Sequence, residues 1–294
     1  MGTGINPFNM GRNAVIFLHP TLRNLTVSCF DIGDDIEAYL SADLKPTALR
    51  SLTFDECNIT VTGLAAILSV PKALEKLTLG ERMYHTYTNS HLPLGRSPAL
   101  LLQVLSLQKD SLQYLKHIGG RTELPEIHND LSMAMFPNLR SMELDTHSTL
   151  TLILRNSAVP PDLHLRLIRS YQFEQPSDEV ENSPLPSILE WLNRVHHLDY
   201  VIDCDGREDR ANILLDLWRD KANQIIWRKI YFLVGIPVTE TQKTASKRHL
   251  RVLVYKRSGF IPPYMYGEKL PEEGIVFDSA LDTTRNPPMK LVTR

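Results

Sequence analysis

Several classes of protein are excluded by what this 294-residue sequence lacks. It has only three cysteines, Cys29, Cys57 and Cys204, and no C-x-x-C pair, so we expect neither a disulfide framework nor a zinc cage. No apolar run approaches the roughly 18 residues of a membrane-spanning helix. Residues Met1 to Pro7 also lack the basic region and apolar core of a signal peptide. We therefore expect no contact with a membrane and a location inside the cell, in the cytoplasm or the nucleus.

The charge balance gives no reason to expect a nucleic acid partner. Lys and Arg number 32 and Asp and Glu 34, which leaves a formal net charge of -2. No positive field therefore draws the chain to nucleic acid or to anionic lipid. The densest basic run, Lys243 to Arg251, would suit acidic partners or RNA, but a solvated loop is the better interpretation.

The sequence also lacks a coherent set of catalytic or ligand-binding residues. It has no Walker loop and no G-x-S-x-G motif, and Gly2-Thr-Gly4 lacks the strand and third glycine of a dinucleotide site. His196 and His197 are neighbours at a strand start, where they point to opposite faces and make poor joint metal ligands. His117 and His128 lack partners at ligand spacing. We predict that the protein is not an enzyme and holds no cofactor or metal.

The strongest pattern is a strand that turns into a helix between residues 49 and 68. Leu52 and Phe54 alternate as in a strand, and Leu64, Ile67 and Leu68 then recur at helical spacing. The strand part has the L-x-x-L-x-L form of a leucine-rich repeat. The same frame begins again at Leu22, Leu74, Leu112, Leu139 and Leu250.

These frames recur at a nearly constant interval. From Leu22 to Leu139 the first leucines lie 27, 25, 38 and 27 residues apart, and the longest interval is one period plus an insertion. One repeat buries too little apolar surface to offset the entropy of ordering it, so the repeats must stack. We predict an α/β leucine-rich-repeat solenoid, with a curved parallel sheet on the concave side and helices on the convex side. It should span residues 1–270, with insertions near 80–97, 119–137 and 171–187 and an irregular tail at 271–294.

The side chains that alternate with the buried leucines should line the concave face. The early frames offer small hydroxyl groups there, and the later frames add charge. We predict that this face binds a protein partner. The predicted binding residues are Thr26, Ser28, Thr53, Asp55, Lys76, Thr78, Lys116, Glu143, Asp145, Asp199 and Asp203.

Cys57 is the most tempting single candidate for chemistry, because a reactive thiol can act as a nucleophile. In the repeat pattern, however, this place holds a Cys or Asn that turns inward against loop backbone, which predicts a structural role. Cys29 follows its first leucine by seven residues and Cys57 by eight, so the two are not equivalent. Cys204 lies between Asp203 and Asp205, which favours a buried cysteine at a strand end.

The residues from Leu49 to Leu79 resemble the cysteine-containing type of leucine-rich repeat, which is common in F-box proteins. Cys57, Ile59-Thr60 and Gly63-Leu64 fall close to the places of that pattern, with one residue fewer after the cysteine. Four further segments look like the repeat region of fungal F-box proteins. They are Pro98 to Leu102, Gln108 to Leu115, Phe136 to Arg140 and Ile261 to Glu268.

The resemblance implies the substrate-recognition part of an F-box-type E3 ubiquitin ligase receptor. The F-box helix itself is not in the sequence, since its nearest string, Leu124-Pro-Glu126, lies inside the repeats. We therefore expect the adaptor of a cullin-RING ligase as a partner only if an F-box exists upstream of Met1. The alternative is a stand-alone leucine-rich-repeat scaffold unrelated to ubiquitin. Under either interpretation we expect a monomer that binds protein on its concave face.

Overall fold

The protein is an α/β protein with a mostly parallel sheet, and it divides into two units. Unit 1 comprises residues 1–165 and unit 2 residues 166–294. The computed structural model describes residues 8–40, 46–81, 94, 98–118, 131–145, 148–160, 162–171, 190–191, 194–204, 249–256 and 275–278. The prediction from the sequence, one repeat region over residues 1–270, stays a prediction.

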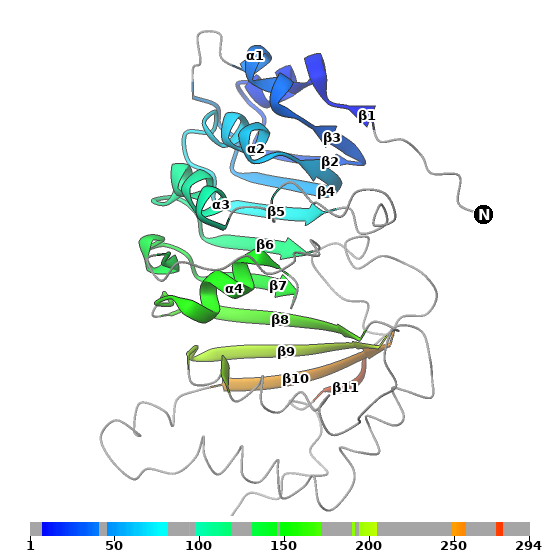
Figure 1. Cartoon of the computed structure of the whole chain (residues 1–294), viewed down its shortest axis with the longest axis vertical. Helices are drawn as coiled ribbons and strands as arrows, with labels where there is room; N and C mark the ends of the chain where they lie inside the picture. The colour runs from blue at the N-terminus through cyan, green and yellow to red at the C-terminus, as the bar shows by residue number, and fades with distance from the viewer. Residues whose placement is uncertain are drawn as a thin grey trace, which may run out of the picture. The chain divides into compact units, whose positions relative to one another are not determined.

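The strands of unit 1 are parallel (Figure 1). They are β1 (Phe8–Asn9), β2 (Asn24–Ser28), β3 (Phe30–Ile32), β4 (Ser51–Ile59), β5 (Lys76–Glu81), β6 (Tyr114–Ile118) and β7 (Ser141–Asp145). The long strand β4 pairs with β2 along its first half and with β3 along its second half, and β1 pairs with β3. Beyond β4 the order is β5, β6 and β7, so sequence order and spatial order coincide.

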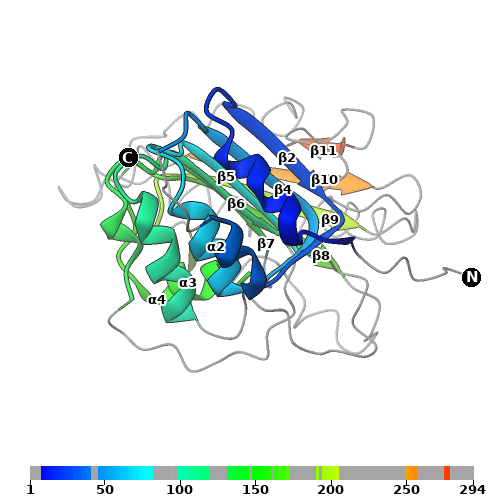
Figure 2. The ribbon, with the colours of Figure 1, turned by 90° about the horizontal axis from the view of Figure 1, so that it is seen from above.

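Helical segments connect these strands. They are η1 (Gly11–Leu18), η2 (Asp34–Ile36), α1 (Glu37–Leu40), α2 (Val61–Leu68), α3 (Pro98–Leu105), η4 (Ser106–Gln108), η5 (Met133–Met135) and α4 (Thr149–Asn156). Figures 1 and 2 show α2, α3 and α4 on one side of the strands β4 to β7, following one another in chain order. The other face of this sheet carries no helix among the described residues of unit 1.

Local sequence sets where these helices begin. Thr60 is the N-cap of α2, where its side chain accepts a hydrogen bond from the Gly63 N–H at 3.0 Å. Ser148 caps α4 in the same way, by accepting from the Leu150 N–H at 3.1 Å. Such a cap satisfies one of the N–H groups that the first turn of a helix leaves unpaired.

The strand pairing places equivalent positions of the frames opposite one another. The second apolar position forms one row across five strands, and the third forms another. The rows are Leu25, Leu52, Leu77, Leu115 and Met142, and then Val27, Phe54, Leu79, His117 and Leu144. All of these side chains except Leu25 are buried. The register expected from the L-x-x-L-x-L frames is therefore confirmed for these five strands.

A backbone contact at the second residue of each frame joins every strand to the next. The carbonyl of Arg23 accepts the N–H groups of Arg50 and Ser51 at 2.7 and 3.0 Å. The same pair of bonds runs from Glu75 and Lys76 to Arg50, from Gln113 and Tyr114 to Glu75, and from Arg140 and Ser141 to Gln113, at 2.8 to 3.1 Å. The His164 N–H then donates to Arg140 at 2.9 Å. We call this series the frame ladder.

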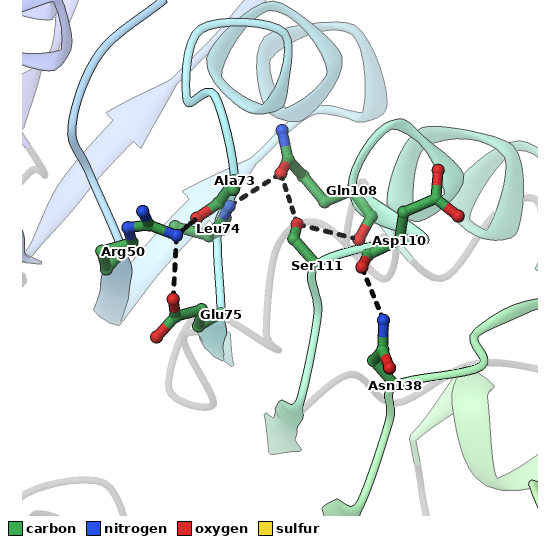
Figure 3. Close-up of polar contacts among 8 residues, drawn as sticks. All are labelled: Arg50, Ala73, Leu74, Glu75, Gln108, Asp110, Ser111 and Asn138. Carbon is green, nitrogen blue, oxygen red and sulfur yellow. Dashed lines mark hydrogen bonds and ion pairs between the residues drawn. The ribbon is translucent and has the colours of Figure 1, made fainter.

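Gln108 ties two successive repeats together through both the oxygen and the nitrogen of its side-chain amide, and Figure 3 shows the contacts of the oxygen. Its Oε1 accepts from the Leu74 N–H at 2.8 Å and from the Ser111 hydroxyl at 2.9 Å. Its Nε2 donates to the carbonyls of Leu68 and Pro71 at 2.8 and 3.0 Å. The buried amide therefore holds the end of α2, the start of β5 and the approach to β6 at fixed positions.

Other polar contacts support the same edge of the sheet, where the strands begin (Figure 3). Arg50 pairs with Glu75 at 2.8 Å, and the Asn138 side chain donates to the Asp110 carbonyl at 2.7 Å. The Arg50–Glu75 pair is exposed to solvent, so it contributes little stability by itself. The Asn138 contact fixes the loop before β7 relative to the loop before β6, because it links the two.

Unit 2 is described mainly by strands. β9 (His197–Cys204) and β10 (His249–Lys256) are parallel, with Leu198 opposite Leu250, and β11 (Ile275–Asp278) is antiparallel to β10. β8 (His164–Tyr171) crosses the boundary between the units. The strands expected at 198–202 and in the frame of Leu250 are thus confirmed. β11 lies in the segment for which the sequence predicts an irregular tail.

Several predictions fall on residues that the structure does not describe. Most of the expected insertions at 80–97, 119–137 and 171–187 lie outside the described residues. The exceptions are the end of β5, Leu94, the segment 131–137 with η5, and the last residue of β8. The tail at 271–294 is described only at β11, and the segment 261–268 is not described.

A substitution at Gly63 tests how closely α2 packs on the preceding repeat. A Cβ at this position would lie 2.8 Å from the Gly33 carbonyl oxygen and 3.1 Å from that of Ile32. The clash that Gly63→Ala introduces should cost about 1 to 3 kcal/mol, and alanine gains about 1 kcal/mol over glycine in a helix. The free energy of unfolding should therefore fall by a net amount of up to about 2 kcal/mol. Urea unfolding followed by circular dichroism measures the change.

The matched control is Thr62→Ala, one residue earlier in α2 and exposed. It should change the free energy of unfolding by less than about 0.5 kcal/mol. A Gly63→Ala protein as stable as this control would show that α2 does not approach the Gly33 backbone.

Candidate functional site

The polar side chains of the frames gather on the sheet face opposite the helices. Phe54 points toward the helical layer, where its ring centroid lies 6.2 Å from that of Phe17 in η1. Thr53, next to it in the strand, therefore points to the other face. Strand pairing aligns Thr53 with four other predicted residues in one row. The row is Thr26, Thr53, Thr78, Lys116 and Glu143.

The exposed part of this face lies over β2, β4 and β5. Thr26, Ser28 and Lys76 are exposed, and Thr53, Asp55 and Thr78 are half-buried. We call these six residues the open polar face. It offers short hydroxyl groups that can donate and accept, with one carboxylate and one ammonium group. Its backbone is held in position by the strand pairing and the frame ladder.

The charged residues over β6 and β7 are buried. Lys116 is 6% exposed, Glu143 7% and Asp145 5%. The Lys116 ammonium group contacts the Glu143 carboxylate at 2.9 Å, and the Tyr114 hydroxyl donates to Glu143 at 3.4 Å. The expectation that these three side chains present charge at the surface is thus corrected. A buried charge needs a partner, and the frames supply Lys116 and Glu143 directly opposite each other.

Asp55 lies within β4, at the end of the open polar face. Burial raises the pKa of its carboxyl group above the ordinary value, while a 3.4 Å hydrogen bond from Ser28 and the charge of Lys116 oppose that shift. The next residue, Glu56, has a positive φ of 51°, and Cys29 has one of 63°. Since these two lie 27 residues apart, the first two frames share a backbone kink, which falls between β2 and β3 in the first frame and inside β4 in the second.

The two predicted binding residues of unit 2 lie in β9. Asp199 is half-buried and stands opposite Arg251 of β10. Asp203 follows in the same strand, opposite Tyr255.

Cys57 is held in the interior by backbone contacts. Its thiol is fully buried and donates to the carbonyls of Val27 at 3.3 Å and Asp55 at 3.4 Å. Burial raises the pKa of the Cys57 thiol to about 11. A thiol that stays protonated is a poor nucleophile. The predicted position of Cys57, turned inward against backbone, is confirmed. Cys29 is equivalent to Glu56 rather than to Cys57, as its spacing from Leu22 predicts.

The structure also contains a buried polar cluster that the sequence pattern does not reveal. The His117 ring lies between two partners, with Nδ1 at 2.6 Å from the Ser148 hydroxyl and Nε2 at 2.5 Å from the Glu81 carboxylate. His117 and Ser148 are fully buried, and Glu81 is 1% exposed. His117 therefore has two partners, although the sequence pointed to none at ligand spacing.

A Glu–His–Ser chain is the arrangement that activates a serine nucleophile in hydrolases. Here the Ser148 hydroxyl already accepts the Leu150 N–H as the cap of α4, and none of the three side chains is open to a substrate. The cluster instead ties β5, β6 and the start of α4 together.

A signal for this cluster is visible once the register is known. His117 takes the place that Val, Phe or Leu fills in the other frames, and Glu81 stands opposite Cys57. Polar residues at two interior-facing positions of neighbouring strands indicate that their side chains pair with each other, because buried polar groups need hydrogen-bond partners.

No group of three or more His, Cys, Asp and Glu side chains that could hold a metal ion is found in the described parts of the chain. No helix in those same parts is long and apolar enough to cross a membrane. Comparisons with protein-family models, with curated proteins and with solved structures find no match. The function must therefore be inferred from the residues and their geometry.

The raised pKa of the Cys57 thiol predicts how the free energy of unfolding depends on pH. Its pKa is 9.0 in an unfolded chain and about 11 in the folded protein, so the unfolded chain loses the proton first as pH rises. The contribution of the thiol to the free energy of unfolding is complete below pH 9. It falls by about 1.4 kcal/mol per pH unit above that, or by about 1 to 3 kcal/mol in total as pH approaches 11. Urea unfolding of the parent and of Cys57→Ala at pH 8, 9.5 and 10.5 measures it.

The difference in unfolding free energy between the parent and Cys57→Ala reports on the Cys57 thiol alone. Tyrosines and lysines titrate in both proteins, so their effects cancel. That difference should shrink as pH rises. A difference that stays constant from pH 8 to 10.5 would mean that the thiol is not held in its protonated form by the fold.

Proposed function

We propose that this chain is an irregular leucine-rich-repeat protein and that it binds another protein on the open polar face of unit 1. The observation that carries the proposal is the row of Thr26, Thr53 and Thr78, aligned across three paired strands and accessible to solvent. The repeated strand register and the frame ladder support the solenoid interpretation, since each repeat contacts its neighbours in the same way.

The composition of the face suits a protein partner. Ser and Thr hydroxyls lose little rotamer entropy when they are ordered, and each can serve as donor or acceptor. Asp55 and Lys76 add charges of opposite sign on neighbouring strands. The contacts described for unit 1 hold these groups on paired strands, so a partner meets a preorganised surface, which lowers the cost of binding.

The resemblance to fungal F-box proteins supports a more specific role as the substrate-recognition part of a ubiquitin ligase receptor. In that role the captured partner is a protein destined for degradation. The alternative is a stand-alone scaffold, whose partner is held and not degraded. The two differ in the fate of the partner and not in the surface that binds it.

Affinity capture with the full chain as bait tests the open polar face. Lys76→Glu reverses an exposed charge on this face and Thr53→Arg places a large side chain at its centre. Each should weaken the binding of the captured partner at least about tenfold, or 1.4 kcal/mol, without changing the melting temperature. Titration of the partner, once it is identified, measures the loss. Lys116 is unsuitable for this test, because its charge reversal would leave Glu143 facing another buried carboxylate.

The matched control is Lys109→Glu, which makes the same charge change at an exposed loop beside η4. It should leave capture unchanged. Equal binding by the Lys76→Glu, Thr53→Arg and Lys109→Glu proteins would reject the open polar face as the binding surface. A partner whose level falls through the proteasome when the chain is expressed would favour the ligase receptor. A partner whose level is constant would favour the scaffold.

A further inference from the structure

The first strand of the repeat stack has an open edge. β2 pairs with β4 on one side, and no strand among the described residues pairs with it on the other. Among the described residues, β1 lies beside the residues after β2, where the Phe8 N–H donates to the Cys29 carbonyl and the Met10 N–H to the Asp31 carbonyl, at 3.3 and 2.8 Å. No described strand lies beside the five residues of β2, Asn24–Ser28, on this edge.

Alternation along the strand shows which backbone groups this edge presents. The Arg23 carbonyl and the Cys29 N–H both point toward β4, where they bond to residues 50, 51 and 55. Alternate residues of a strand direct their N–H and C=O groups to opposite sides. Asn24, Thr26 and Ser28 therefore direct theirs away from β4, and all three residues are exposed.

β2 lacks two of the features by which proteins protect an open strand edge, charged residues and proline. Its sequence, Asn-Leu-Thr-Val-Ser, contains no charged residue and no proline. A row of alternating donors and acceptors at strand spacing is matched only by the backbone of another extended segment.

The helical layer is also apolar at the same end of the stack. In η1, Ala14 and Phe17 are buried, whereas the two residues between them are open to solvent, Val15 at 56% and Ile16 at 40%. Terminal repeats of a stacked protein normally carry a polar outer face. Exposed apolar side chains beside an open strand edge mark a surface that another element covers.

We propose that a second copy of this chain covers this end, with the two β2 strands pairing antiparallel across a two-fold axis. An uncharged edge is complementary to itself. Thr26 then stands opposite the second copy's Thr26, a favourable cross-strand pair, and Asn24 opposite the second copy's Ser28. This dimer departs from the monomer that the sequence predicts.

The same symmetry accounts for the exposed residues of η1. A two-fold axis perpendicular to the sheet keeps the helical layers of both copies on the same side of the joined sheet. The η1 segments then lie beside each other, and Val15 and Ile16 are shielded from water. Both observations, the open edge and the apolar helix face, are explained by one contact.

Sedimentation velocity of the full chain over a range of concentrations tests the proposal. We expect a reversible monomer–dimer equilibrium. Thr26→Lys and Thr26→Glu should each raise the dissociation constant at least about tenfold, because like charges then oppose each other across the axis. An equimolar mixture of the two variants should restore the dimer as a heterodimer.

The matched control is Thr53→Lys, which places the same charge in the same row one strand further in. It should leave the dimer unchanged. For the helical contact, Ile16→Asp should weaken the dimer, whereas Leu107→Asp, at a residue 52% exposed in η4, should not. Far-ultraviolet circular dichroism and melting temperature check that each variant is folded.

Three results would overturn the proposal. One is a chain that stays monomeric at every concentration at which it is soluble. Another is a dimer that Thr26→Lys and Ile16→Asp both leave intact. The third is a mixture of the Thr26→Lys and Thr26→Glu variants that associates no better than either alone.

Discussion

The structure of unit 1 depends on one backbone contact, made once in each repeat. The carbonyl of the second frame residue accepts two N–H groups from the next frame, at residues 23, 50, 75 and 113. This contact fixes the register of each strand against the next, and register decides which side chains are buried. The aligned rows of leucine and the aligned row of hydroxyls are both consequences of it. The buried amide of Gln108 supports the same alignment across the 38-residue interval between Leu74 and Leu112, where the chain carries an insertion.

Much of unit 1 could be predicted because its signals are local. The frames give the strands, Thr60 and the apolar spacing after it give α2, and the place of Cys57 in the frame gives its burial. The alternation within each strand also gives the row of polar side chains correctly. A period of two and a period near 27 are enough for these inferences, since both are read directly along the sequence.

The rest depends on contacts between residues that are distant in sequence. Glu81, His117 and Ser148 meet only because β5, β6 and α4 are neighbours in the fold, and no spacing along the chain connects them. The burial of Lys116 and Glu143 depends on their surroundings, whereas alternation predicts only which face they occupy. The division into two units at residue 165 is likewise a property of contacts in the fold.

The two binding surfaces that we propose on unit 1 differ in what they would recognise. The open polar face presents side chains, so it would select a partner by the pattern of hydroxyls and two charges. The edge of β2 presents backbone, which gives affinity for an extended strand with little dependence on its side chains. Thr26 and Ser28 belong to both surfaces, so occupation of one changes the surroundings of the other.

Native-state hydrogen exchange at the amides of the frame ladder tests the account most directly. The amides of residues 50 and 51, 75 and 76, 113 and 114, and 140 and 141 should all be protected. In the solenoid that we propose, each repeat is stable only against its neighbours, so these amides should open with similar free energies, close to that of unfolding unit 1. Exchange of these amides at the rates of an unstructured peptide, or protection of only one pair, would contradict the account.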